Sequence, residues 1–292
     1  MDPVVSVIKS TGHYDGVRKA LQLIEEQIEH DIKDKKKILV KPNFVSTSRQ
    51  LAATHVDAVK AVLDMITQYH SGMILIGEGP ANSSLTTGLT NFNYLTLRDE
   101  YDVEFLDLNR DDWVEVEGYD SQLRPLTFRL SKSVVESDYR VSVAIPKTHD
   151  CVITTLSIKN MVVGSLVNNE KPKIHQGYKG INLNLATFSS FVMPNLGVID
   201  GFIGMEGRGP VSGNPVELRV AAASLYPISL DAVISKIMGF DPFEIGYLQH
   251  LHEWKRGVID LEQITVLDTS INDVAQRFQP HPRYHEMHNW RI

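Results

Sequence analysis

Residues 37–79 read KILVKPNFVSTSRQLAATHVDAVKAVLDMITQYHSGMILIGEG, and this stretch decides the fold. An apolar strand at 37–41 ends at Pro42, and a second buried strand follows at 73–76. Between the two strands lie apolar residues at helical spacing, namely Val59, Val62, Leu63 and Ile66. Thr54, which precedes them, is the expected N-cap. Two strands joined through a helix form a βαβ unit, which predicts that the strands are parallel.

The same alternation continues on both sides of this unit. We expect a helix from about Asp15, with Val17, Leu21, Ile24 and Ile28 on its buried face. A third strand is expected at 103–108 and irregular or antiparallel β structure around 113–128. Further strands are expected at 139–145, 197–200 and 219–223, and further helices at 231–238 and 243–253.

This pattern predicts an α/β fold with mostly parallel sheets and flanking helices, in two lobes with a cleft between them. The lobes are expected at residues 1–130 and 131–292. No Pro/Gly/Ser-rich linker marks the boundary near 130, so the lobes can also be interleaved.

Composition excludes several classes of partner. A net charge of −7 gives the chain no field that attracts a phosphate backbone, so we expect no nucleic acid. The single cysteine, Cys151, excludes an internal disulfide and an iron–sulfur cluster held by four cysteines. No signal peptide or run of about 20 apolar residues is apparent, so we expect a cytoplasmic protein without a membrane partner. A homo-oligomer is compatible with the sequence.

Ligands of parallel sheets usually bind beyond the carboxyl ends of the strands, so the residues after each strand are the first candidates. Lys41 and Asn43 could bind a carboxylate or phosphate, although a surface lysine and a turn-forming asparagine are the plainer interpretation. Glu78 lies in Gly77-Glu78-Gly79, which lacks the third glycine of the dinucleotide fingerprint. These glycines are typical of a tight turn. The alternative interpretation is that Glu78 contacts a ligand.

The loop Pro146–His149 and the segment Ser157–Asn160 bring two lysines and a histidine into a short span. His149 could be a general acid or base, a metal ligand, or a purely structural histidine. A desolvated lysine, Lys147 or Lys159, could act as a base or nucleophile. Asn160 is a candidate contact of a cofactor.

Two later segments also carry polar groups. The run Asp200–Pro210 holds four glycines around Asp200, Glu206 and an arginine, and we expect the two carboxylates to orient a cofactor or cation. The alternative is a flexible surface loop. His281, His285 and His288 near the carboxyl end could bind a transition metal on a helix, but Pro280 and Pro282 favour a non-functional tail.

Over residues 4–267 the chain resembles the "domain of unknown function 362" family. The resemblance rests, in order, on Lys41-Pro42-Asn43, Thr54-His55, Pro146-Lys147-Thr148-His149, Lys159-Asn160, Asp200-Gly201-x-x-Gly204-Met205-Glu206-Gly207-x-Gly209-Pro210-x-x-Gly213 and Asp231-Ala232. Some members carry an added ferredoxin-like segment with clustered cysteines. This chain has one cysteine, so the resemblance implies no internal iron–sulfur relay.

A second resemblance, to the nickel-pincer lactate racemase family, rests on the spacing of His149, Lys159 and His175. In that family the lysine anchors the pincer nucleotide and histidines serve in catalysis or nickel ligation. The glycine-rich segment beside the racemase lysine is absent here, and so is the histidine of the racemase's first lobe. We therefore expect a divalent metal at His149 and His175 rather than the nickel-pincer nucleotide.

The residues support two hypotheses. The first is an enzyme acting on a small anionic organic substrate by racemisation, isomerisation or a related redox step. Lys41, Asn43 and Lys147 bind the anion in this hypothesis, and His149 transfers a proton. The second is a non-catalytic module that binds a nucleotide-like or metal cofactor. Both place Lys41, Glu78, His149 and Asp200 on one edge of the sheet, facing a common cleft.

Overall fold

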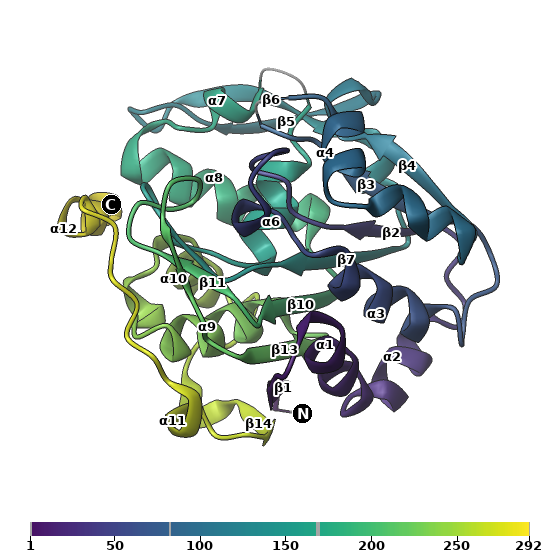
Figure 1. Ribbon diagram of the computed structural model, residues 1–292. Coiled ribbons are helices and arrows are strands. Elements are labelled where there is room, and N and C mark those ends of the chain that lie inside the picture. The colour runs from purple at the N-terminus through teal and green to yellow at the C-terminus, as the bar shows by residue number, and fades with distance from the viewer. Residues whose placement is uncertain (1, 82, 168–169, 292) are drawn as a thin grey trace.

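The computed structural model describes residues 2–81, 83–167 and 170–291, and its centre is an eight-stranded sheet (Figure 1). The strand order is β14-β1-β13-β10-β7-β2-β3-β4. All neighbours pair in parallel except β13, which is antiparallel to both β1 and β10. The α/β class and the mostly parallel sheet are therefore confirmed.

The strands of the described chain are β1 (Val4–Lys9), β2 (Ile38–Lys41), β3 (Ile74–Glu78), β4 (Val103–Asp107), β5 (Trp113–Tyr119), β6 (Pro125–Ser131), β7 (Tyr139–Ala144), β8 (Lys147–His149), β9 (Ile153–Thr155), β10 (Leu196–Gly201), β11 (Gly204–Glu206), β12 (Asn214–Val216), β13 (Val220–Ser224) and β14 (Thr265–Asp268). The helices are α1 (His13–Gln22), α2 (Glu25–Ile32), α3 (Val56–Ile66), α4 (Leu85–Asn91), α5 (Lys132–Val135), α6 (Ser157–Gly164), α7 (Glu170–Lys173), α8 (Gly177–Val192), α9 (Pro227–Ile237), α10 (Gly246–Glu253), α11 (Ile271–Val274) and α12 (Tyr284–Met287).

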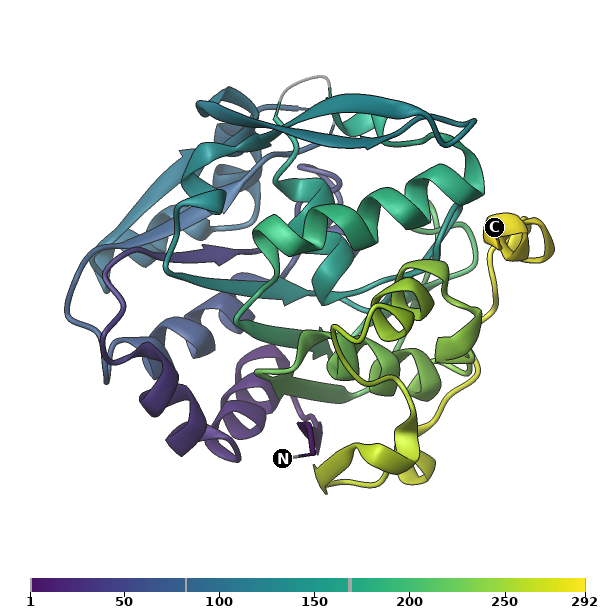
Figure 2. The same cartoon turned by 180° about the vertical axis from the view of Figure 1, so that it is seen from behind.

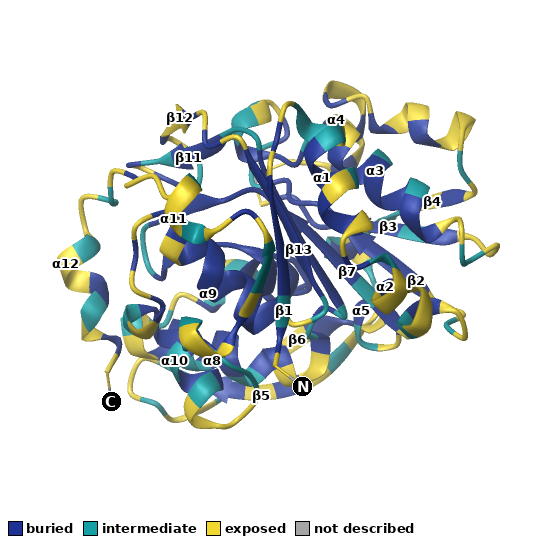
Figure 3. Cartoon of the chain, turned by 90° about the horizontal axis from the view of Figure 1, so that it is seen from below, coloured by how far each residue is buried: buried dark blue, intermediate teal, exposed yellow. Residues whose placement is uncertain are grey.

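Helices cover both faces of the sheet (Figures 1 and 2). On one face the apolar sides of α1, α2 and α3 pack on the strands, and on the other face α6 and α9 do so, with α8 and α10 packed against these two helices. Figure 3 shows the strands as a buried layer between these helices. A strand covered on both faces is buried and mainly apolar because neither face meets water, and β2 and β10 are apolar up to Lys41 and Asp200 near their carboxyl ends.

The second half of the chain does not form a separate sheet. Strand β2 pairs with β7, and β1 pairs with β13, so segments on both sides of residue 130 share one sheet. The boundary expected near residue 130 falls inside β6. Residues 1–130 and 131–292 therefore contribute neighbouring strands to one sheet.

A smaller sheet, of order β12-β11-β8-β9, lies beyond the carboxyl ends of β7 and β10 in the large sheet. Strand β8 begins shortly after β7 ends, and β11 begins shortly after β10 ends. Residues 146–149, expected as a loop, form this short strand because β9 and β11 pair with it on both sides. The small sheet holds Lys147 and His149 in fixed positions over the edge.

Two local expectations were wrong. The helix from Asp15 is broken into α1 and α2 at Leu23–Ile24, and no glycine or proline marks the break. The N-cap of α3 is His55, whose Nδ1 accepts the Asp57 N–H, and not Thr54. The Thr54 hydroxyl instead donates to the Val143 carbonyl and accepts the Asn43 N–H, which ties the loop after β2 to the end of β7.

The segment around 113–128 is the antiparallel hairpin β5–β6, which confirms the β structure expected there. The hairpin packs on α8 (Figure 2), with Phe128 edge-on to Phe188 and their ring centroids 5.0 Å apart.

Among the described residues, no helix is both long and apolar enough to cross a membrane.

Candidate functional site

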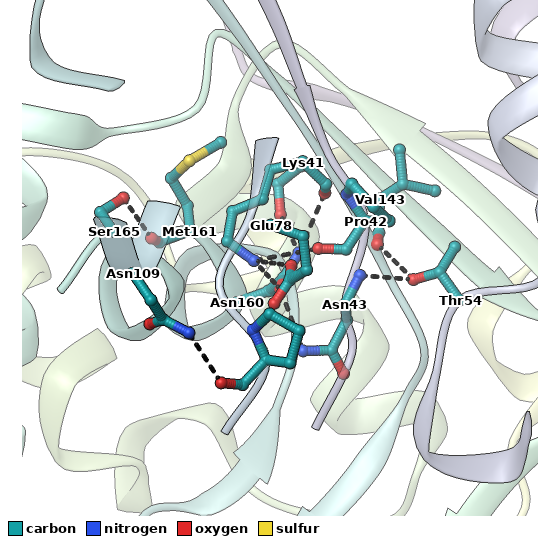
Figure 4. A network of polar contacts seen from close by, with 12 residues as sticks. Lys41, Pro42, Asn43, Thr54, Glu78, Asn109, Val143, Asn160, Met161 and Ser165 are labelled. Carbon is teal, nitrogen blue, oxygen red and sulfur yellow. Dashed lines mark hydrogen bonds and ion pairs between the residues drawn. The ribbon is translucent and has the colours of Figure 1, made fainter. Parts of the chain in front are cut away.

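A buried ion pair lies where β2 and β3 end side by side. The Lys41 Nζ donates to Glu78 Oε2 at 2.5 Å, to the Pro42 carbonyl at 2.9 Å and to Asn160 Oδ1 at 3.0 Å. Both side chains are almost completely buried (Figure 4). Burial lowers the pKa of Lys41, and Glu78 opposes that shift. With three acceptors, the ammonium group is fully hydrogen-bonded and held in place.

The Lys41 side chain passes the end of α6 on its way to Glu78. It has room to do so because residue 164 is glycine. A Cβ added to Gly164 would lie 1.8 Å from Lys41 Cε and 2.2 Å from its Nζ. Any larger residue at the end of α6 would therefore displace the amine.

Two asparagines extend the network beyond the pair (Figure 4), and one of them joins it to a second lysine. Asn160 Oδ1 accepts Asn43 Nδ2 at 3.1 Å, and Asn160 Nδ2 donates to the Ser142 hydroxyl at 3.0 Å. The amine of Lys147 donates to Asn43 Oδ1. The network thus joins the ends of β2, β3 and β7 through α6.

A cavity of about 60 Å³ lies beside this network. Its lining includes Lys41, Glu78, Lys159 and Lys171. Three lysines and one glutamate therefore line the cavity, and Lys147, whose amine bonds to Asn43, is buried as well. Unpaired charge is costly to bury, so this lining favours an anion in the cavity. We call this cavity and its lining the lysine pocket.

Two groups in the lysine pocket have no partner in the part of the chain that the structure describes. Lys159 is 7% exposed, and no described acceptor receives a hydrogen bond from its amine. The hydroxyl of Thr155, which also lines the pocket, is buried without a partner. Buried polar groups in folded proteins are nearly always hydrogen-bonded, so these two donors point to a ligand.

Asp231 sets the position of the helix that carries Lys159 and Asn160. Its buried carboxylate accepts the N–H groups of Ser157 and Ile158 at 3.0 Å each, at the first turn of α6. A carboxylate at a helix N-terminus satisfies free N–H groups and interacts well with the helix dipole. Burial still raises the pKa of Asp231 to about 7.

His149 lies next to the lysine pocket, on β8. Its Nδ1 accepts the Cys151 N–H at 3.0 Å, and Asp150 Oδ1 is 3.1 Å from the same nitrogen. Burial, followed by the charge of Lys159, holds the pKa of His149 well below its usual range. The imidazole is therefore neutral at pH 7. The bond from the Cys151 N–H places the ring proton on Nε2, whereas the tautomer with its proton on Nδ1, facing Asp150 Oδ1, leaves Nε2 free to accept a proton.

The turn after His149 gathers groups that could hold a metal. Ligand atoms of His149, Asp150 and Cys151 all lie within 4.8 Å of one another. His175, expected as the second metal ligand, is exposed and faces the Lys171 carbonyl with Nδ1 at 3.1 Å. Burial, followed by the charge of Lys159, lowers the pKa of His175.

Asp200 and Glu206 lie away from the lysine pocket. Asp200, at the end of β10, pairs with His13 Nδ1 at 2.7 Å, and the His13 ring stacks on His55 at 4.2 Å. Glu206 accepts the Gln279 N–H at 2.8 Å and so holds the carboxyl-terminal segment. Lys41, Glu78, His149 and Asp200 follow parallel strands at one edge of the sheet, but only Lys41 and Glu78 line the same cavity.

The glycines after Asp200 allow two chain segments to pack closely. A Cβ on Gly209 would lie 2.1 Å from the Thr148 carbonyl oxygen, and one on Gly213 would lie 2.3 Å from that of Glu206. Glycine at these two positions lets the run after Asp200 pack closely against β8 and β11. This packing role is additional to any contact that the run makes with a ligand.

Sequence reasoning missed Lys171, Thr155, Asp150 and Cys151 as members of this region. Lys171 lies in a polar run that reads as solvent-exposed, yet its amine reaches the Leu166 carbonyl at 2.7 Å. A signal was available for Asp150 and Cys151, because both directly follow His149 in a sequence with one cysteine.

The buried lysines predict how stability depends on pH. Burial lowers the pKa of Lys147 to about 7 and that of Lys159 to about 8. Above these values the folded chain binds fewer protons than the unfolded chain, so the contribution of each lysine to stability rises with pH. We expect the melting temperature of Lys159→Met to exceed that of the wild type at pH 7, with a gap that narrows between pH 8 and about 10. A gap that widens over this range in calorimetry would contradict the assignment.

Three comparisons place this geometry among known proteins. The chain is 27% identical over 221 residues to the thylakoid-associated protein sll1697 of Synechocystis sp. (strain ATCC 27184 / PCC 6803 / Kazusa), an alignment that covers 73% of this chain and 66% of that protein. The chain thus spans slightly less than two thirds of that relative's length. The fold is similar to that of the lactate racemase apoprotein from Thermoanaerobacterium thermosaccharolyticum, with a TM-score of 0.52 at 13% identity over 78% of this chain and 55% of that one. The model of the family described as "Domain of unknown function (DUF362)" matches residues 38–236, so the chain belongs to that family.

Proposed function

We propose that this protein is an enzyme that holds the carboxylate or phosphate of a small organic substrate in the lysine pocket and moves a proton on that substrate. One observation carries the proposal: the Thr155 hydroxyl is buried without a partner and the Lys159 amine makes no hydrogen bond to a described residue, in a lining with more amines than carboxylates. An anionic group would supply the missing acceptor and the missing negative charge. The fold similarity to a lactate racemase is compatible with this chemistry.

The roles follow from the contacts. Lys41 and Asn160 are already hydrogen-bonded and form a rigid wall, whereas Lys159 is the amine free to pair with the substrate. With Nδ1–H donated to Asp150 Oδ1, the free Nε2 of the neutral His149 would take the proton from the carbon next to the substrate's carboxylate, and the electron pair would move onto the carboxylate oxygens. Fixed cations stabilise such a developing charge. Return of the proton gives racemisation or isomerisation.

A divalent metal at His149, Asp150 and Cys151, where three ligand types meet, is the alternative use of His149, because an imidazole that ligates a metal cannot also accept a proton. It would polarise a substrate oxygen when bound. The nickel-pincer nucleotide is not part of the proposal, because a cavity of about 60 Å³ beside Lys159 is too small for a nucleotide. Asp200 with Glu206 remains a second place for a cation, outside the lysine pocket.

The alternative is a module that binds an anionic or metal cofactor without turnover. The family match names no activity, and a binding role needs only the free donors of the lysine pocket. We further propose a cytoplasmic location, because the single cysteine fits a reducing compartment. Fractionation would separate this from a thylakoid association, which the relative's name describes for that protein.

The deciding experiment combines binding and turnover. A panel of chiral 2-hydroxy and 2-amino acids and small phosphorylated acids is screened for thermal stabilisation, and each stabilising compound is then incubated in ²H₂O. We expect ²H to enter at the carbon next to the carboxylate, and Lys159→Met to lose it. Stabilisation without exchange or product by any stabilising compound would favour the binding module.

A further inference from the structure

A cavity of about 700 Å³ lies at the edge of the sheet opposite the lysine pocket. Pro3 precedes β1, Arg140 is the second residue of β7 and Asn195 precedes β10, so the cavity opens at the amino ends of these strands. None of the pocket residues described above lines it. Its volume is in the range that holds a whole small organic ligand.

Three features of this cavity attract negative charge. The first is the N-terminus of α9, where Pro227, Ile228 and Ser229 line the cavity. The N-cap residue Tyr226 gives no side-chain hydrogen bond to this turn, so its N–H groups are without that acceptor. An eleven-residue helix with an uncapped N-terminus is suited to an anion.

The second feature is a pair of cations, Lys255 and Arg256, that follow α10. Lys255 has a φ of 57°, in the left-handed region where a helix end favours glycine. The Arg256 N–H bonds to the Leu251 carbonyl at 2.9 Å, which is the closing bond of such a helix end. Lys255 thus occupies a position that favours glycine, and it lines the cavity.

The third feature is Arg140, which is half-buried in the cavity wall. Its Nε donates to the Met193 carbonyl at 3.0 Å and its Nη1 to the Ser137 carbonyl at 2.7 Å. These hydrogen bonds fix the guanidinium group in place, while Nη2 donates no hydrogen bond to a described residue. Asp31 is the acid in a lining that holds Arg140, Lys255 and Arg256, so the lining is net positive in a chain whose net charge is −7.

The rest of the lining is apolar or aromatic. Met193, Pro194, Leu225 and Val258 contribute apolar surface, and the Tyr226 ring is 40% exposed. We propose that this cavity is a second ligand site, for an organic anion with an apolar or aromatic body. The anionic group would lie between the N-terminus of α9 and Lys255–Arg256, and the body would lie against Tyr226 and Leu225. This inference is independent of the function proposed for the lysine pocket.

The test uses the full chain and the fluorescent probe 1-anilinonaphthalene-8-sulfonate, which has an aromatic body and one sulfonate. We expect saturable binding of one probe per chain, weakened at least about five-fold by Lys255→Gly or Arg256→Ala. Lys255→Gly should also raise the melting temperature by roughly 1–3 °C, because glycine relieves the left-handed strain. Competition with adenosine monophosphate and with decanoate distinguishes an aromatic body from an alkyl body.

Two controls separate this site from other causes. Arg219 is also a basic residue with positive φ, at 53°, but lies outside the cavity, so Arg219→Gly should leave probe affinity unchanged. Lys159→Met should leave it unchanged as well, which keeps the result separate from the lysine pocket. Probe affinity that is equal in the wild type, Lys255→Gly and Arg256→Ala would overturn the proposal.

Discussion

Replacing Lys159 with methionine is expected to stabilise the free protein by about 1–3 kcal/mol at pH 7 and to abolish binding of small anions. Lys159 is 7% exposed and its pKa is lowered to about 8, chiefly by burial. A lowered lysine pKa measures the cost of the buried charge, at ~1.4 kcal/mol for each pKa unit. Methionine has a similar length without the charge. Denaturant unfolding gives the stability and calorimetric titration gives the binding.

The matched control is Lys236→Met, because Lys236 is exposed on α9 and has no role in the lysine pocket. It should change stability by less than about 0.5 kcal/mol and leave binding intact. If Lys159→Met instead destabilised the protein and kept its affinity for anions, Lys159 would be a structural residue.

Replacing Glu78 with glutamine is expected to cost about 3–5 kcal/mol of unfolding free energy, because it leaves Lys41 charged and buried without its counter-ion. The two groups are 2.5 Å apart and both are almost fully buried. Equilibrium unfolding in urea measures the loss. The double variant Lys41→Met with Glu78→Gln removes the uncompensated charge and should recover most of it.

An exposed pair offers the comparison for this cycle. Lys60 and Glu100 are 2.6 Å apart but lie at the surface, so Glu100→Gln should cost less than about 1 kcal/mol. If Glu78→Gln costs no more unfolding free energy than Glu100→Gln, or if the double variant is less stable than both single variants, the buried pair does not stabilise the fold in this way.

Much of the fold followed from periodicity. The segment 37–79 predicted β2, α3 and β3 because apolar strands and one helical stripe leave few other arrangements. The same reasoning could not place the break between α1 and α2, because Leu23 and Ile24 are ordinary helix residues and tertiary packing decides their conformation.

The candidate site followed only in part, for a reason that is also physical. Strand ends predicted that Lys41 and Glu78 would meet, since parallel neighbours end at one edge. Sequence spacing carries no information on long-range partners such as His13 for Asp200, which is 187 residues away. Nor could it show that Lys159 lacks a partner, because hydrogen bonding depends on the whole packed environment.

The most direct test of the lysine pocket is a crystal structure of the full chain determined with bromide, whose anomalous scattering identifies it. The account predicts a bromide peak within contact distance of the Lys159 amine and the Thr155 hydroxyl, and none there in Lys159→Met crystals. A wild-type structure with no bromide in the pocket, and with Lys159 hydrogen-bonded to a protein acceptor, would contradict it.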